Sequence, residues 1–106
     1  MNVTVEKLDN VKKITLNVEK FDVANMQEIK KNIQTEVDAE KSDILIDLSN
    51  VSFVDSSGLS VIISVFKQLK SSNHKLELCG LQAQPMELLE ITQLHKIFTI
   101  INSCNK

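Results

Sequence analysis

The chain of 106 residues contains no arginine, tryptophan or tyrosine, and it has only two glycines and one proline. Its twelve cationic residues are therefore all lysines, set against fourteen acidic residues for a net charge of −2. Arginine supplies the planar fork that suits phosphate groups and base edges, so its absence argues against direct binding of nucleic acid. The absence of a glycine-rich phosphate loop argues against a nucleotide-dependent kinase.

Long apolar runs and clustered cysteines are also lacking. No run approaches the roughly 20 residues that span a membrane, and the N-terminus has no signal-peptide pattern, so we expect no membrane insertion. Cys79 and Cys104 are too few and too far apart to predict a metal site or a disulfide framework. Cys79 lies in an apolar run and is interpreted as a small core residue, whereas Cys104 lies in the C-terminal tail. This usage fits a reducing cytoplasm.

Short apolar segments with two different periodicities alternate along the chain. Alternating or continuous apolar residues predict strands near residues 3–5, 14–18, 44–48 and 76–80. Apolar residues at helical spacing predict helices over residues 26–37 and 59–69, and a short helix from Pro85. Residues 97–101 fit either a last strand or a helix turn.

Two polar segments indicate how these elements are joined. Asp9 and Asn10 predict a hairpin turn, and Asn25 followed by Glu28 predicts a capping box at the first helix. The order of the elements predicts a single α/β domain over residues 1–106, with a mixed four- to five-stranded sheet and helices packed on it. Ligands of such sheets bind at the carboxyl ends of the strands.

The most informative segment, residues 47–59, joins a predicted central strand to the second helix. Asp55, Ser56, Ser57 and Gly58 open that helix, which places a serine hydroxyl at its positive end. A phosphate on that hydroxyl would be stabilised locally, as a regulatory switch requires. The same residues also fit a plain helix start, because aspartate and serine are preferred N-caps. The spacing by itself favours the plain cap.

Helical geometry divides the second helix into two faces. The expected buried stripe consists of Leu59, Ile62, Ile63, Phe66 and Leu69. The expected outer face consists of Ser57, Ser60, Val61, Ser64 and Gln68. An outer face that is small, uncharged and carries an exposed valine is typical of a partner-contact surface. The same residues fit an ordinary solvated helix surface equally well.

Several segments together resemble the STAS domain, a family named for sulfate transporters and anti-sigma factor antagonists. The resemblance is carried by Asp55-Ser56-Ser57-Gly58-Leu59, by Phe21-Asp22, by residues 78–81 and by the closing run of residues 88–98. Within the family the chain looks like the stand-alone bacterial anti-sigma factor antagonists. It departs from the pattern before Phe21-Asp22, where Lys20 or Glu19 replaces a common glycine, and at Gln93, which replaces a frequent glycine.

The resemblance implies a non-enzymatic, cytoplasmic regulator without cofactor or metal. Its unmodified form would bind a partner that is both anti-sigma factor and serine kinase, and would thereby free the sigma factor. That partner would phosphorylate Ser56, and a serine phosphatase would reverse the modification. The partner-binding residues predicted from the motif, its matching positions and the helix face are Asp22, Asn25, Asp55, Ser57, Gly58, Ser60, Val61 and Ser64. Contacting the partner, ordering the loop near Ser56 and capping the first helix are alternative roles for Asp22.

Two other interpretations belong to different functional classes. The chain could be a STAS interaction subunit of a larger assembly, such as a stressosome scaffold or a lipid-transport complex, that is never phosphorylated. The retained Asp55-Ser56-Ser57-Gly58 motif favours the phosphorylated switch over this alternative. An enzyme with Ser56 as nucleophile is the weakest interpretation, because no motif places His74 or His95 as its base.

Overall fold

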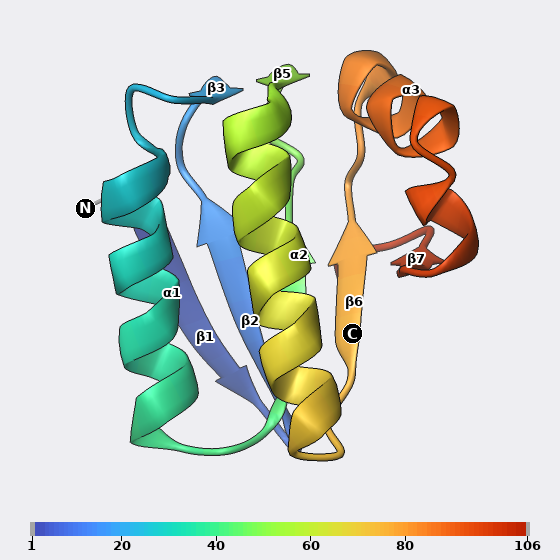
Figure 1. Ribbon diagram of the computed structural model, residues 1–106. Helices are drawn as coiled ribbons and strands as arrows, with labels where there is room; N and C mark the ends of the chain where they lie inside the picture. Colours follow the sequence, from blue (N-terminus) through green and yellow to red (C-terminus); the bar gives the residue numbers. More distant parts are fainter. Residues whose placement is uncertain (1, 106) are drawn as a thin grey trace.

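The computed structural model describes residues 2–105, which form a mixed sheet with helices packed on it (Figure 1). The strands of the sheet are β1 (Val3–Leu8), β2 (Val11–Leu16), β4 (Asp43–Asp47), β6 (Leu76–Cys79) and β7 (Thr99–Ile101). The helices are α1 (Met26–Ala39), α2 (Ser56–Ser71) and α3 (Ala83–Ile91), followed by the 3-10 turn η1 (Leu94–Lys96). None of the helices within residues 2–105 combines the length and apolar character needed to cross a lipid bilayer.

The spatial order of the strands is β1-β2-β4-β6-β7. β1 pairs with β2 in antiparallel orientation, and the other neighbours are parallel. Since side chains alternate along a strand, Ile14, Ile46 and Leu78 lie in register on one face, fully buried against α1 and α2 (Figure 1). The prediction of a mixed four- to five-stranded sheet is confirmed, and the choice between strand and helix turn near the C-terminus is settled as β7.

The two predicted connections have different outcomes. Asp9 and Asn10 form the hairpin turn, and Asp9 adopts a positive φ of 36°. The capping box is wrong, because the Asn25 side chain makes no capping hydrogen bond to α1. It is engaged on the loop before the helix, and Glu28 instead accepts a hydrogen bond from Asn2 Nδ2 at 2.6 Å.

A second, two-stranded sheet was not predicted. It consists of β3 (Lys20–Phe21) and β5 (Phe53–Val54), paired in parallel, and it lies next to the start of α2 (Figure 1). Strands of two residues are too short to produce a periodic pattern, so the sequence gives no signal for them. The pairing matters because it brings the chain after β3 next to the chain after β5.

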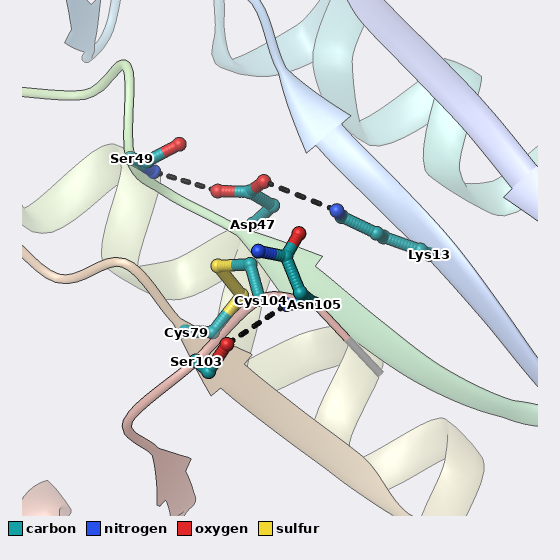
Figure 2. The surroundings of a disulfide bond; sticks show 7 residues. All are labelled: Lys13, Asp47, Ser49, Cys79, Ser103, Cys104 and Asn105. Atoms are coloured by element: carbon teal, nitrogen blue, oxygen red, sulfur yellow. Dashed lines mark hydrogen bonds and ion pairs between the residues drawn. A yellow bond between two sulfur atoms is a disulfide. The ribbon is translucent and has the colours of Figure 1, made fainter.

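Cys79 and Cys104 form a disulfide bond, which corrects the expectation of two separate thiols (Figure 2). β6 and β7 are parallel neighbours with Cys79 opposite Ile101, so the segment after β7 can turn back onto the sheet. The two Cα atoms are 5.3 Å apart although the residues are 25 positions apart in sequence, a distance suited to a disulfide. The burial expected for Cys79 is confirmed.

Candidate functional site

Ser56 is the first residue of α2, and it is exposed. It directly follows β5 and Asp55, at the end of the molecule toward which β2 and β6 point (Figure 1). The carboxyl edge of a parallel sheet and the amino end of a helix meet here, as the sequence predicted. The hydroxyl-bearing residue is therefore within reach of another protein.

Asp55 fastens two segments together beside Ser56. Its Oδ1 accepts a hydrogen bond from the Gly58 amide at 3.0 Å, which caps α2. Its Oδ2 accepts a hydrogen bond from the Val23 amide at 3.1 Å, in the loop between β3 and α1. Carboxylates that accept backbone amides at an N-cap make strong, charge-assisted hydrogen bonds. The N-cap predicted from the sequence is therefore present, and it also holds a neighbouring loop.

The loop between β3 and α1 is closed by its own polar side chains. Asp22 Oδ1 accepts from the Ala24 amide at 3.0 Å. Asn25 Oδ1 accepts from the Asp22 amide at 3.1 Å, and Asn25 Nδ2 donates to the Lys20 carbonyl at 2.7 Å. Of the alternative roles for Asp22, these contacts support ordering of the loop near Ser56.

Gly58 is buried where the first turn of α2 crosses β3. A Cβ atom at this position would lie 2.4 Å from the Phe21 carbonyl oxygen and 2.9 Å from Cγ of the Phe21 ring. Glycine is therefore required by a close approach of helix and strand. Gly58, which was predicted to be a partner-binding residue, is buried and contributes to the packing beneath the site.

Replacing Gly58 with alanine should destabilise the protein by about 2 kcal/mol, because backbone and ring atoms must move to admit the methyl group. Alanine otherwise favours a helix over glycine, so the sign of the effect identifies the clash. Ser57→Ala, one residue earlier, is the matched control and should change stability little. Urea denaturation of both variants measures the difference. A Gly58→Ala protein as stable as the control would contradict the close approach.

The predicted outer face of α2 is partly wrong. Val61 is only 1% exposed, and Val65 is buried as well. Ile63 and Phe66, predicted to be buried, are half-buried. The reason is that α2 packs against α1 as well as against the sheet, so its buried arc is wider than the predicted stripe and includes Val61 (Figure 1). The exposed residues of the helix include Ser56, Ser60, Lys67 and Lys70, whereas Ser57, Ser64 and Gln68 are half-buried.

Two exposed apolar residues near Ser56 were missed by the sequence analysis. Val23, whose amide is bound by Asp55, is 71% exposed, and Phe53 in β5 is 40% exposed. Single exposed apolar side chains are common, but two beside the same loop make this surface suitable for protein contact. Periodicity could not have found them, because it predicts exposure only inside regular helices and longer strands.

The histidines are engaged elsewhere. His74 Nδ1 lies 3.4 Å from an Asp43 carboxylate oxygen, and His95 Nδ1 lies 3.3 Å from the Leu89 carbonyl. Neither contact involves Ser56. This arrangement gives no support to Ser56 as an enzymatic nucleophile.

A separate cluster on the sheet brings together Asp47, Cys79 and Cys104, whose oxygen and sulfur atoms lie within 4.8 Å of one another. The two sulfur atoms are bonded to each other. Asp47 accepts from the Ser49 amide at 2.9 Å and lies 3.7 Å from Lys13 Nζ (Figure 2). The cluster was not anticipated from the sequence.

Known proteins are similar to this chain in sequence and in fold. The STAS domain family matches residues 2–106. The anti-sigma-B factor antagonist of Bacillus subtilis is 30% identical over 101 residues, which cover 94% of this chain and 92% of that protein. The anti-sigma-B factor antagonist of Listeria monocytogenes is 44% identical over 57 residues, which cover 54% of this chain and 50% of that protein.

Solved structures agree in fold. An anti-sigma factor antagonist from Mycobacterium paratuberculosis superposes with a TM-score of 0.86 at 20% identity, covering 97% of this chain and 86% of that one. The Bacillus protein SpoIIAA in its phosphorylated form superposes with a TM-score of 0.75 at 16% identity, covering 97% of this chain and 92% of that one. At these identities the likeness concerns the fold alone.

Proposed function

Because this chain belongs to the STAS domain family, and within it to the anti-sigma factor antagonists, we propose that it is a partner-switching regulator. In its unmodified form it binds a protein that is both an anti-sigma factor and a serine kinase. Phosphorylation of Ser56 by that kinase ends the binding, and a serine phosphatase restores it. The chain acts as a binding protein without chemistry of its own, in the cytoplasm where sigma factors work.

One observation carries the proposal: Ser56 is exposed at the first position of α2, next to a loop fastened by Asp55. A kinase can reach such a residue without unfolding the domain. A protein of the same fold, SpoIIAA, has been solved in phosphorylated and unphosphorylated forms. The fold is therefore compatible with a phosphorylated state.

Electrostatics explains why phosphorylation would weaken partner binding. A phosphate adds about −1.5 to −2 charges at neutral pH. The neighbouring Asp55 carboxylate already accepts from the Gly58 and Val23 amides, and no arginine exists in the chain to neutralise a second anion. The start of a helix tolerates the added charge. The modification therefore acts at the interface, by repulsion and by the cost of removing water from an unpaired anion.

The proposed contact surface consists of residues around Ser56 whose side chains are exposed or half-buried. It includes Ser56 and its surroundings from the β3–α1 loop, β5 and the first turns of α2. Its residues are Asp22, Val23, Asn25, Phe53, Asp55, Ser57, Ser60 and Ser64. Gly58 and Val61 are removed from the surface because both are buried.

The direct test is phosphopeptide mapping after incubation of the chain with ATP and a lysate of the organism that encodes it. We expect a single phosphate on Ser56, absent from Ser56→Ala and retained by the control Ser71→Ala, which changes an exposed serine at the opposite end of α2. Unchanged phosphate incorporation by Ser56→Ala would contradict the proposal. Absence of any phosphate would favour the unphosphorylated interaction subunit.

A further inference from the structure

The face of the sheet opposite α1 and α2 has an unusual cover. Leu45 lies on this face, two residues before Asp47 on β4, and it is completely buried although it is not part of the core beneath the helices. Cys79 is opposite Asp47 in the strand register and lies on the same face. No helix of residues 2–105 covers this face, so Leu45 is buried by neighbouring side chains or by an irregular segment (Figure 1).

The segment after β7 crosses the same face. Figure 2 shows Ser103, Cys104 and Asn105 crossing the sheet beside Asp47 and Cys79. Residues 102–105 belong to no helix or strand. The Asn105 amide donates to Ser103 Oγ at 3.1 Å, a contact internal to the segment. The covalent bond from Cys104 to Cys79 is therefore the strongest link between this segment and the sheet.

We propose that Cys79 and Cys104 form a redox-responsive latch for the C-terminal segment. Oxidation fastens residues 102–105 across the helix-free face, and reduction releases them and exposes the surface around Asp47 and Cys79, which are both buried. Where thiol systems keep cysteines reduced, the latch is open and closes under oxidative conditions. The latch is independent of Ser56 and of the proposed phosphorylation.

The chemistry requires an oxidant of the low-molecular-weight disulfide class. The thiolate of Cys104, which is the less buried cysteine, attacks one sulfur of the oxidant and releases one small thiol. The Cys79 thiol then loses its proton to solvent, and its sulfur attacks Cys104 Sγ in the mixed disulfide. The second small thiol leaves. Two cysteine thiols are oxidised, and one small disulfide is reduced to two thiols.

The test compares the full chain after oxidised glutathione with the same chain after a reductant. Intact mass should show the loss of two hydrogen atoms without a glutathione adduct. Closing a loop over the 25-residue separation should lower the unfolding equilibrium constant roughly 300-fold, measured by urea denaturation. Hydrogen exchange in residues 99–105 should be slower in the oxidised chain.

Two matched variants separate the latch from general effects of oxidation. Cys104→Ser should behave identically under both conditions and resemble the reduced wild type. Ser103→Ala, one residue earlier, should keep the full response, and so should Ser56→Ala. Oxidation that yields only glutathione adducts or linked dimers would overturn the proposal. So would an internal disulfide that leaves hydrogen exchange of residues 99–105 unchanged.

Discussion

The Ser56→Asp protein should bind the partner kinase about 100-fold more weakly than the Ser56→Ala protein. The partner has to cover this exposed residue, and an aspartate there loses its water while it stands next to another carboxylate, Asp55. The nearest carboxylate, Asp55, already accepts from two amides at the start of α2 and in the adjacent loop. Titration calorimetry with the kinase identified by phosphate transfer measures both affinities.

Stability separates repulsion at the interface from damage to the fold. An acidic residue in the first turn of a helix is favourable by about 0.3–1 kcal/mol, so Ser56→Asp should unfold at a urea concentration at least as high as Ser56→Ala. A variant that is stable and does not bind supports the proposed switch. Equal affinity of the two variants for the partner kinase would contradict the repulsion mechanism.

Replacing Val61 with lysine should destabilise the domain by about 4 kcal/mol or more. Val61 is 1% exposed among the buried apolar residues of α2, so an ammonium group there would be removed from water. The free energy of unfolding of small domains is only about 5–15 kcal/mol, so a loss of this size removes a large part of the stability. Thermal and urea unfolding give the size of the loss.

Ser60→Lys is the matched control, one position earlier on the same helix. Ser60 is exposed, so the lysine remains in water and the free energy of unfolding should change by less than about 0.5 kcal/mol. It lies one turn after Ser56, so this variant should lose partner affinity while remaining folded. If the two variants showed the same stability, the buried position of Val61 would be incorrect.

Local chemistry explains which parts of the fold were predictable. The strands and helices follow from apolar spacing, and the N-cap Asp55 acts on an amide only three residues away. The predicted capping box was wrong for a reason that is also local. Asn25 had a competing partner in the preceding loop, and its amide and carbonyl groups bind there.

Features that join distant parts of the chain were not predictable in this way. The Asp55 contact to Val23 spans 32 positions, and the disulfide between Cys79 and Cys104 spans 25. The burial of Val61 depends on the packing of α2 against α1 in addition to the sheet. Periodicity measures only which side chains share one face of a helix, and it does not reveal how many neighbours that helix has.

The sequence by itself determined an α/β fold with a serine at the start of the second long helix, because propensity, periodicity and capping act within a few residues. Only the tertiary structure decided that Gly58 lies against Phe21, that Val61 is internal and that the segment after β7 is fastened across the sheet. Each of these depends on the spatial approach of segments far apart in the chain. Such approaches are set by the packing of the whole domain and leave no local pattern in the sequence.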